Sequence, residues 1–555
     1  MKFAHGAWLD ADPDPVTRAE LQLLIHEDGD ELVRRFDGHL DFGTAGIRGQ
    51  LGAGPQRMNR VLVRCVAAAV GAVLRAHHGD DKKLSAVIGY DARHMSEEFA
   101  TDTARVLAGM GFAVTIIGEP HPTPLLAFAV RHLNAVAGVM VTASHNPPAD
   151  NGIKVYWGDG VQIIPPIDSE IADAMSSGGV VDPDSVAAFD DPRLVYSDLA
   201  LVDAYIRAAT SLLKIGSSRK LTAVYTPLHG VGAQLAEKVF TAAGFSPLIA
   251  VPEQVVPDPD FPTTPFPNPE EPGALDLARA LADQIGADVV LAHDPDADRF
   301  AAVVPDGEKW RTLSGNEIGV LLADHLLRSG GGSNRLVVTT VVSSQMLSAL
   351  ARHHQVEYAE TLTGFKWIMR PALARPEVDL VLGYEEALGF AFGDEVRDKD
   401  GITAMVLFAE LVAELSSAGE TVIDRLHELF GICGVHRTGQ ISLRREGSAG
   451  LAAIATAMSS LRSTPPSSVA GRSVTSVVDL AEHDPDRGST DAMVLYFEGE
   501  HSARLVVRPS GTEPKLKLYG EVVLAAGDDV REAGRVGDQE VETLLKDLAE
   551  QLLPD

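Results

Sequence analysis

Cysteine is nearly absent from this sequence, which has only Cys65 and Cys433 among 555 residues. Two cysteines so far apart form neither a disulfide framework nor the spacing of a metal site, and their scarcity is typical of a reducing compartment. The N-terminal segment MKFAHGAWLDADPDP lacks the apolar core of a signal peptide. No run approaches the roughly 18 apolar residues that a membrane-spanning helix needs. We therefore expect a cytoplasmic protein without a membrane span.

Positive charge is also scarce. The chain has 47 basic and 78 acidic residues, which gives a net charge of −31. This excess argues against binding to nucleic acid or to an anionic membrane, although a local cluster of Arg and Lys can still bind a small anionic substrate. The remaining composition is that of a folded protein, and the chain is too long for a single core.

A strand–helix–strand pattern recurs three times. It begins at AVIGYD (86–91), TAVYTP (222–227) and RLVVTTVV (335–342), each followed by a polar turn, a segment of helical period and a second short apolar run. The alternation predicts three similar mixed-sheet α/β domains. The last part of the chain reads instead as several strands closed by the amphipathic segment DQEVETLLKDLAEQLL, which predicts an α+β domain. We expect domains at 1–205, 206–315, 316–435 and 436–555.

Three aspartates alternate in HDPDADRF (293–300), between two apolar strand candidates. Alternate side chains of extended backbone share one side, so Asp294, Asp296 and Asp298 are expected to converge. Close carboxylates repel unless a cation lies among them, and an all-oxygen set suits Mg²⁺ or Ca²⁺. An EF-hand is excluded because Arg299 and Pro305 stand where it needs Gly and Glu. An acidic surface turn is the alternative.

A serine, a histidine and a lysine share the loop in VTASHNPPADNGIKVYW (141–157), which we expect to be exposed between two strands. Mg²⁺ is commonly shared between carboxylates and phosphate, so Ser144 is a candidate phosphate carrier, with His145 and Lys154 beside it. Adjacent Ser and His cannot by themselves form a catalytic triad, and a serine in a loop is usually a turn residue. The loop alone leaves both interpretations open.

The segment RLVVRPSGTEPKLKLYG (504–520) places a glycine and several donors between two predicted strands. A glycine allows backbone N–H groups to point at one spot, and an arginine can bind phosphate through two hydrogen bonds. This pattern predicts a phosphate-binding loop, with a polar hairpin as the alternative. Its candidate residues are Arg508, Ser510, Gly511, Thr512 and Lys515.

Two further stretches carry weaker signals. In GYEEALGF (383–390), Glu385 and Glu386 follow an apolar strand, where carboxylates can hold sugar hydroxyls, but an exposed acidic turn would look the same. In FGTAGIRG (42–49), a glycine-rich loop surrounds Arg48 and could be no more than a tight turn.

Taken together and in this order, these stretches resemble the α-D-phosphohexomutase superfamily. TASHNP with NGIK is similar to its phosphoserine loop, DPDADR to its metal-binding loop, GYEEALGF to its sugar-binding loop and RPSGTEPKLKLY to its phosphate-binding loop. FGTAGIRG, TPLHGVG (226–232), TLTGFKW (361–367) and the chain length are similar to the branch with bacterial phosphoglucomutases and phosphopentomutase-like enzymes. RPSGTEP also resembles phosphoglucosamine mutases, which are typically shorter and lack TPLHGVG. The resemblance covers nearly the whole chain and implies four domains around a central cleft.

The resemblance also implies a reaction. Ser144 would be phosphorylated in the resting enzyme, and its phosphate would hold Mg²⁺ together with Asp294, Asp296 and Asp298. The phosphoryl group would pass to a sugar monophosphate, and the resulting bisphosphate would turn and return its other phosphate to Ser144. A sugar 1,6-bisphosphate would prime the enzyme. Interconversion of glucose 1-phosphate and glucose 6-phosphate is the first choice, ahead of mannose and pentose phosphates.

Individual roles follow from the same resemblance. The catalytic residues would be Ser144, Arg48, His145, Lys154 and Lys399, the last in RDKDG, where the family has a lysine proposed as general acid/base. The substrate-binding residues would be Arg299, Thr363, Gly364, Glu385, Arg508, Ser510, Gly511, Thr512 and Lys515. The partners would be small sugar phosphates, without nucleic acid or membrane, for a monomer or homodimer.

One departure leaves the sugar open. Many glucose- and mannose-specific members have Glu-Ser in the sugar loop, whereas Ala387 follows Glu386 here, and Phe390 lies near the place of a histidine found in some mannose-active relatives. Two other hypotheses remain. A metal-dependent phosphatase that uses Ser144 as nucleophile would not need the phosphate-binding loop, and a non-catalytic sensor would not need all the reacting groups.

Overall fold

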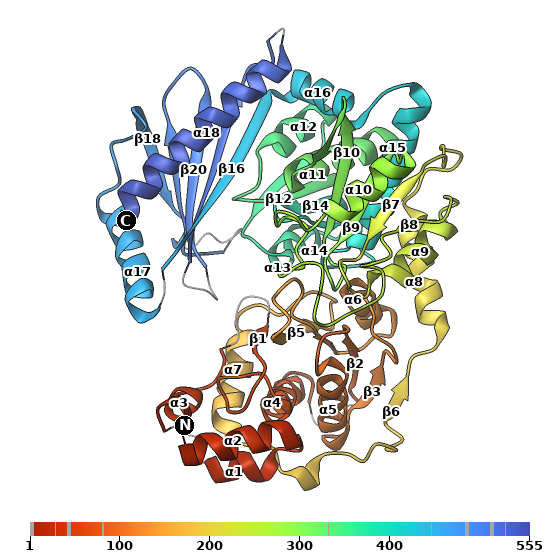
Figure 1. Ribbon diagram of the computed structural model, residues 1–555, viewed down its shortest axis with the longest axis vertical. Helices are drawn as coiled ribbons and strands as arrows, with labels where there is room; N and C mark the ends of the chain where they lie inside the picture. The colour runs from red at the N-terminus through yellow and green to blue at the C-terminus, as the bar shows by residue number, and fades with distance from the viewer. Residues whose placement is uncertain are drawn as a thin grey trace. The chain divides into compact units, whose positions relative to one another are not determined.

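The computed structural model describes residues 5–27, 29–41, 46–79, 83–330, 332, 334–445, 447–482, 488–510, 515–527 and 529–554. The chain forms two compact units. The first unit combines Met1–Leu313 with Gly389–Glu414, and the second combines Ser314–Leu388 with Leu415–Asp555. Both contain helices and sheets, as Figure 1 shows.

The first unit begins with a mixed six-stranded sheet in the order β1-β5-β4-β2-β3-β6. The strand β2 pairs in parallel with β3 and β4, whereas β5 runs antiparallel to both β4 and β1. The elements are α1 (His5–Ala11), α2 (Pro15–Glu27), α3 (Gly29–Phe36), β1 (Ile47–Gln50), α4 (Arg60–His78), β2 (Ser85–Tyr90), α5 (Ser96–Gly109), β3 (Ala113–Ile116), α6 (Thr123–His132), β4 (Ala137–Val141), β5 (Asp150–Trp157), α7 (Ile167–Gly178), the 3₁₀ turn Pro183–Ser185, β6 (Leu194–Tyr196) and α8 (Leu199–Ser211).

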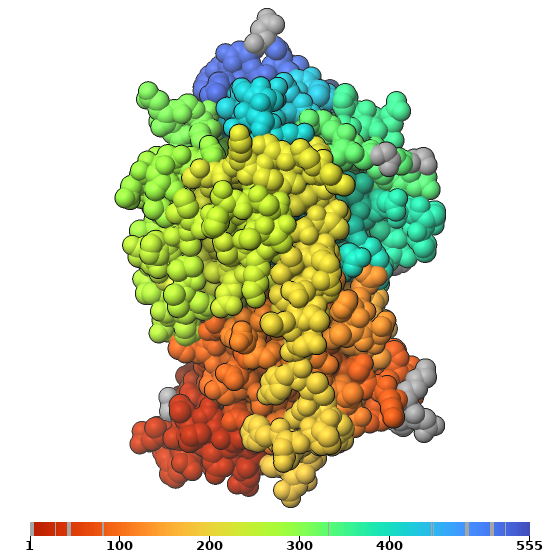
Figure 2. All heavy atoms as spheres, turned by 90° about the vertical axis from the view of Figure 1, so that its right-hand side faces the viewer, coloured from red at the N-terminus to blue at the C-terminus, as the bar shows by residue number. Residues whose placement is uncertain are grey.

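Helices cover both faces of this sheet. Ile88 of β2 belongs to a core shared with α4, α5 and α7. The next residue, Gly89, faces Leu126 of α6, as expected because successive strand residues point to opposite faces. The segment around residue 200, yellow in Figure 2, lies on the surface, and Phe189 and Tyr196 are exposed there.

A five-stranded sheet in the order β11-β10-β9-β7-β8 follows in the first unit. Its strand β7 pairs in parallel with β8 and β9, and the hairpin strands β9, β10 and β11 are antiparallel. Phe300 packs on Phe408, which fixes the start of α15 beside β10. The elements are β7 (Ala223–Thr226), α9 (Gly232–Ala242), β8 (Ile249–Ala250), α10 (Asp276–Ile285), β9 (Val289–His293), β10 (Phe300–Asp306), β11 (Lys309–Thr312), β15 (Gly389–Ala391) and α15 (Gly401–Ala418).

The second unit starts with a parallel arrangement in which β12 pairs with β13 on one side and β14 on the other. A capping box between Ser314 and Glu317 starts its first helix. The elements are α11 (Gly315–Ser329), β12 (Arg335–Thr340), α12 (Met346–His354), β13 (Glu357–Thr361), α13 (Phe365–Ile368), α14 (Arg370–Leu373), β14 (Asp379–Glu385) and α16 (Val422–Cys433).

The C-terminal part of the second unit is an antiparallel sheet in the order β16-β21-β20-β19-β18-β17. The helix α18 buries Val541, Leu544 and Leu548 and packs on β16 and β21. The predicted α+β character is therefore confirmed. The elements are β16 (Val435–Arg444), α17 (Gly447–Ser463), β17 (Ser468–Val469), β18 (Arg472–Asp479), β19 (Met493–Phe497), β20 (Ser502–Pro509), β21 (Lys515–Leu524) and α18 (Val530–Leu552).

Two helices have the length and composition of a membrane span, contrary to the expectation that no segment approaches one. They are α4 and α15. However, 67% of the apolar window in α4 and 78% of that in α15 are buried inside the protein, and core helices pass the same test. Their apolar character is thus accounted for by packing.

Glu521 of β21 ties the C-terminal sheet to the start of α12 within the second unit. Its carboxylate accepts hydrogen bonds from Ser344 Oγ at 2.7 Å, from the N–H of Gln345 at 2.8 Å and from Arg504 Nε at 3.0 Å. His436 Nδ1 lies 2.9 Å away. Burial would raise the pKa of Glu521, but the contacts with His436, Arg504 and Ser344 outweigh it and lower the pKa to about 2.

Replacing Glu521 by glutamine tests how much this carboxylate stabilises the second unit. The folded pKa of about 2 lies below the ordinary value of 4.5, so ionised Glu521 stabilises the fold above pH 4.5, and this contribution is lost as the pH falls toward 2. We expect Glu521→Gln to lose on the order of 3 kcal/mol at neutral pH, and the difference from the wild type to shrink in acid. Urea denaturation followed by circular dichroism across this pH range measures it.

The exposed Glu550 of α18 offers a matched control. Glu550→Gln removes the same charge from the same unit and should follow the wild type at every pH. If the curves of Glu521→Gln and the wild type stay parallel into acid, the stabilisation does not come from the ionised carboxylate.

Candidate active site

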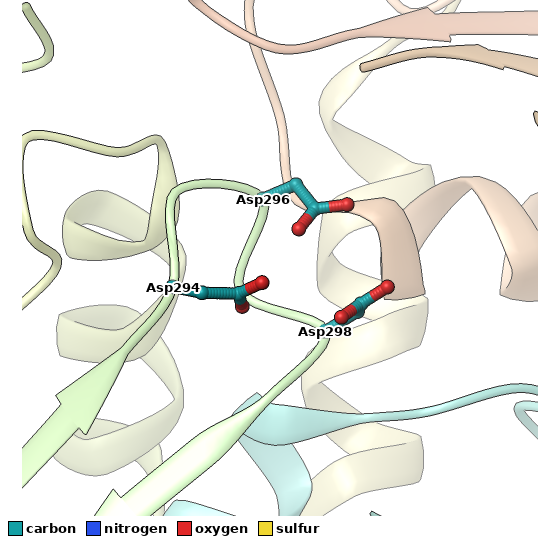
Figure 3. A group of neighbouring side chains, drawn as sticks. All are labelled: Asp294, Asp296 and Asp298. Atoms are coloured by element: carbon teal, nitrogen blue, oxygen red, sulfur yellow. The ribbon is translucent and has the colours of Figure 1, made fainter. Parts of the chain in front are cut away.

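The loop between β9 and β10 brings three carboxylates together. Figure 3 shows Asp294, Asp296 and Asp298 around one space, and one oxygen of each lies within 4.8 Å of the others. All three are buried. The convergence was predicted, but the reason given for it was wrong. The backbone makes a turn, in which the N–H of Ala297 donates to the carbonyl of Asp294 and Ala297 has φ +52°, so the segment is not extended.

This cluster has the donor set of a hard divalent cation. Among the described side chains, Oδ1 of Asp296 and Oδ1 of Asp298 are buried without a hydrogen-bond partner. Burial, reinforced by repulsion from Asp296 and Asp298, raises the pKa of Asp294 well above its usual range. Unsatisfied carboxylate oxygens in a buried all-oxygen set are what Mg²⁺ requires, so the residues present fit this ion.

Two lysines lie against the carboxylates. Lys154 Nζ is 2.7 Å from Asp296 Oδ2 and 2.6 Å from Asp298 Oδ2, and Lys399 Nζ is 3.3 Å from Asp298 Oδ2. Burial would raise the pKa of Asp298, but Lys154, Lys399 and Arg299 outweigh it and lower the pKa. Burial would likewise lower the pKa of Lys154, yet the two aspartates raise it. Both partners of this ion pair are therefore charged at neutral pH.

Ser144 meets the same cluster from the loop between β4 and β5. Its Oγ donates a hydrogen bond to Asp294 Oδ2 at 2.8 Å and lies 3.1 Å from His145 Nδ1. Ser144 is only 3% exposed and Lys154 is equally buried, so the expectation of an exposed loop is wrong. The loop is covered because the metal-binding loop of the next domain packs over it.

Two arginines and a histidine lie beside Ser144 and Asp294. Arg48 of β1 donates to Asn146 Oδ1 at 2.8 Å, which places it beside the Ser144 loop. The backbone N–H of Arg299 donates to Asp294 Oδ1 at 3.0 Å. Burial, with further help from Arg299 and Arg48, lowers the pKa of His145 well below its usual range. His145 is therefore neutral at pH 7.

The loop that carries Lys399 is held by residues that the sequence analysis did not identify. Tyr156 Oη donates to Asp398 Oδ2 at 2.5 Å, and Gln162 Nε2 donates to the same oxygen at 2.8 Å. A Cβ on Gly401 would lie 2.5 Å from the carbonyl oxygen of Arg299, so only glycine allows the two loops to approach. No local pattern marks Tyr156 or Gln162, because their partner is more than 230 positions away.

Thr123 was also missed. At the start of α6, its Oγ1 donates to Asp296 Oδ2 at 2.6 Å, and its N–H donates to the carbonyl oxygen of Asp296 at 3.0 Å. The available signal was the threonine of HPTP (121–124), which the structure places at the start of α6. Such a residue presents N–H groups to an acceptor.

The other predicted substrate-binding residues lie in the second unit. Thr363 and Gly364 follow β13, and Glu385 ends β14. Since both strands run parallel to β12, their carboxyl ends meet at one edge of the sheet, where ligands of α/β folds commonly bind.

The predicted phosphate-binding loop connects β20 to β21. Arg508 lies on β20, and the N–H of Ser510 donates to the carbonyl oxygen of Lys515 at 2.8 Å, which closes the hairpin. Gly511 and Thr512 lie outside the described residues.

Three family models match the chain in order. Residues 39–179, 203–307 and 314–430 match the phosphoglucomutase/phosphomannomutase alpha/beta/alpha domains I, II and III. The chain belongs to the α-D-phosphohexomutase superfamily. Both the predicted family and the predicted class of three α/β domains with a fourth C-terminal domain are thereby confirmed.

Curated phosphohexomutases differ in the sugar that their names give. A probable phosphomannomutase of Haemophilus influenzae is 41% identical over 86% of this chain and 95% of its own length. A probable phosphoribomutase of Schizosaccharomyces pombe is 36% identical over 92% of each chain. A phosphoglucomutase of Staphylococcus aureus is 33% identical over 93% of this chain and 96% of its own. The chain is thus a phosphomutase of a Mg²⁺-dependent family.

The signature TPLHGVG positions the metal-binding loop. Leu228 and His229 have positive φ angles, and the next residue, Gly230, packs on Pro295 inside the aspartate loop. A Cβ on Gly230 would lie 2.2 Å from Pro295 Cα, and the N–H of Val231 donates to the carbonyl oxygen of Pro295 at 2.8 Å. Because the backbone of Gly230 lies directly against the backbone of Pro295, a side chain at position 230 has no room.

Replacing Asp294 by asparagine tests the metal centre without harming the fold. The variant keeps the shape but removes one ligand charge, so we expect Mn²⁺, used as a probe, to bind at least about 10-fold more weakly. Because ionised Asp294 is costly here, as its raised pKa shows, the metal-free variant should melt no lower than the wild type. Electron paramagnetic resonance of free Mn²⁺ and a thermal melt give the two readouts.

Glu308→Gln, an exposed change in the same domain, should alter neither the Mn²⁺ affinity nor the melting temperature. Unchanged Mn²⁺ affinity in Asp294→Asn would contradict the site.

Gly230→Ala should displace the aspartate loop. The added methyl group meets the backbone of Pro295, which cannot move without shifting its neighbours Asp294 and Asp296. We expect weaker Mn²⁺ binding, by about 10-fold or more, in a protein that still folds. Gly178→Ala, where nothing lies within 4 Å of the new methyl group, is the control. Equal affinity in both variants would show that the close approach of Gly230 does not position the loop.

Proposed function

We propose that the protein is a phosphosugar mutase that moves a phosphoryl group reversibly between C1 and C6 of a hexose phosphate. Glucose 1-phosphate and glucose 6-phosphate are the favoured pair. The observation that carries the proposal is the hydrogen bond from Ser144 Oγ to Asp294 within the buried aspartate cluster. It places a hydroxyl among carboxylates and lysines suited to phosphoryl transfer, which depends chiefly on positioning and charge neutralisation.

In this mechanism Ser144 carries the phosphoryl group. A free hydroxyl of the sugar attacks the phosphorus, the bond between phosphorus and Ser144 Oγ breaks, and a sugar bisphosphate forms. Ser144, Asp294, Asp296 and Asp298 would hold Mg²⁺, which would supply positive charge for phosphoryl transfer. The reverse attack, after the bisphosphate has turned, returns the other phosphate to Ser144.

Lys399, Lys154 and His145 have separate roles in the transfer. Lys399, in its neutral amine form, receives the proton of the attacking hydroxyl and returns it in the second half of the reaction. Lys154, held charged by Asp296 and Asp298, neutralises charge and fixes the loops. Neutral His145 orients Ser144 Oγ.

Substrate binding is assigned to both units. Arg48 and Arg299 bind the transferring phosphate, and the residues of the β20–β21 loop bind the phosphate that is not transferred. A cradle for the distal phosphate lets the sugar bind in either orientation, which a mutase needs and a phosphatase does not. The loop residues are Arg508, Ser510, Gly511, Thr512 and Lys515, and the sugar contacts are Thr363, Gly364 and Glu385.

The sugar loop bears on which substrate is preferred. Ser343 Oγ lies 3.2 Å from Glu386 Oε2 and accepts the N–H of Glu386 at 3.2 Å, so Glu386 shapes the loop and Glu385 is the proposed sugar ligand. Ala387 lacks the hydroxyl found in many glucose- and mannose-specific members, a difference of one hydrogen bond worth about 0.5–1.5 kcal/mol. This departure leaves the sugar open, with mannose and pentose phosphates as the alternative substrates.

The cellular setting completes the proposal. We infer a cytoplasmic monomer or homodimer of four domains, with boundaries near 205, 315 and 435, that acts on free sugar phosphates and binds neither nucleic acid nor membrane. A sugar 1,6-bisphosphate phosphorylates Ser144 and so activates the enzyme.

A coupled assay tests this function. With Mg²⁺ and a trace of glucose 1,6-bisphosphate, we expect glucose 1-phosphate to be isomerised faster than mannose 1-phosphate or ribose 1-phosphate. Ser144→Ala removes the phosphate carrier and should lower kcat by at least about 1,000-fold. Ser177→Ala, an exposed change in the same domain, should keep wild-type activity.

Each other result assigns a different function. A preference for ribose 1-phosphate that is lost in Ser144→Ala keeps the mechanism and changes the sugar. Release of inorganic phosphate without isomerisation identifies a phosphatase. No isomerisation of any of the three sugars by phosphorylated enzyme would contradict the mutase proposal.

A further inference from the structure

Arg93 donates hydrogen bonds to the backbone of the Ser144 loop. It follows β2, is 5% exposed, and directs its guanidinium at four carbonyl oxygens of one loop. Its Nη2 donates to Ser144 O at 2.7 Å and to Asn146 O at 2.5 Å. Its Nη1 donates to Pro147 O at 2.9 Å and to Asp150 O at 3.2 Å. One side chain therefore satisfies the carbonyl groups along one side of the loop.

The loop needs such support because its backbone is strained at the reacting residue. Ser144 has φ +51°, in the left-handed region that is strained for a residue other than glycine. Such a conformation persists only where surrounding contacts impose it. The Arg93 hydrogen bond to Ser144 O holds the carbonyl on one side, while Ser144 Oγ reaches Asp294.

Arg93 is itself fixed on two sides. Its N–H donates to Asp91 Oδ1 at 3.0 Å, and its Nε lies 3.5 Å from Asp91 Oδ2. Ser96 Oγ donates to Asp91 Oδ1 at 2.6 Å. The ring of Phe261, from the proline-rich loop of the second domain, lies 4.9 Å from Arg93 Cζ. Because Asp91 pairs with its charge and the Phe261 ring covers one face of its guanidinium, the Arg93 side chain is held rigidly.

We propose that Arg93 is a positioning residue that holds Ser144 in the conformation from which it exchanges its phosphoryl group. The inference rests on the proposed function, since it takes Ser144 as the phosphate carrier. Only arginine suits the place. Its planar fork reaches four acceptors at once, whereas a lysine is a point charge that can bind one part of the loop.

The variant Arg93→Lys tests the proposal, with Arg64→Lys as matched control. Arg64 lies in the same domain, is 6% exposed and pairs with Asp102 at 2.7 Å, so its replacement disturbs a similarly buried arginine far from the Ser144 loop. A misplaced reacting group can cost about 100-fold in rate. We expect Arg93→Lys to lose about that factor in kcat with KM changed less than about 3-fold, and Arg64→Lys to keep kcat even where its melting temperature falls equally.

Hydrogen exchange supplies a readout that does not depend on activity. The peptide covering residues 142–151 should exchange faster in Arg93→Lys than in the wild type or Arg64→Lys. A wild-type kcat in Arg93→Lys, or exchange in this peptide equal to that of Arg64→Lys, would overturn the proposal. If the wild type isomerises no sugar phosphate while faster exchange remains, the proposed function fails and the support of the loop by Arg93 stands.

Asp91→Asn keeps the test decisive should Arg93→Lys not fold. It leaves the guanidinium in place but removes the charge that anchors it. Exchange in residues 142–151 must then rise above the wild type, and wild-type exchange there would overturn the proposal.

Discussion

The burial of three carboxylates within a few ångströms of one another is the constraint on which the rest of the first unit depends. Asp294, Asp296 and Asp298 repel one another, and burial makes each charge more costly. Every element around them offsets that cost. Lys154 comes from β5, Lys399 from the loop before α15, and a hydroxyl from the start of α6. The charge that remains unsatisfied, at two carboxylate oxygens, is the part that a divalent cation completes.

This electrostatic demand also explains features that look unrelated in sequence. Glycine is required at 230 and 401 because neighbouring backbone must come within contact distance of the aspartate loop. The left-handed backbone of Ser144 is tolerated because Arg93 holds its carbonyl and Asp294 its hydroxyl. Strain at Ser144 is thus balanced by hydrogen bonds from two different domains of the first unit.

Much of the fold follows from local pattern, because strands and helices are set by periodicity over a few residues. AVIGYD, TAVYTP and RLVVTTVV each begin a strand–helix–strand unit, as predicted. Several helices outside these repeats were not predicted: α1 to α4 precede the first repeat, and α17 lies among strands. The predicted C-terminal amphipathic segment is α18. GIC at the end of α16 is apolar and short enough to read equally well as a strand. Short apolar runs are ambiguous until tertiary contacts decide them.

The site was predictable to the extent that its chemistry is written in contiguous motifs. The three aspartates, Ser144 and the two lysines were identified from the sequence as candidate site residues. The structure places them within hydrogen-bonding or ion-pairing distance of their partners. Their burial was not predictable, because it arises from a loop of another domain. Tyr156, Gln162 and Thr123 escaped for the same reason: each acts on a partner that is distant in the chain.

Choice of sugar is a different problem from transfer of phosphate. A group that binds a phosphoryl recognises its charge and geometry, which are the same whichever sugar carries it, so it does not distinguish glucose from mannose or ribose. Discrimination must come from contacts with sugar hydroxyls, each worth only about 1 kcal/mol. A single change such as Ala387 can therefore alter preference by about fivefold while the aspartate cluster stays intact. Relatives whose names give three different sugars match most of this chain, so the overall fold does not set the choice of sugar either.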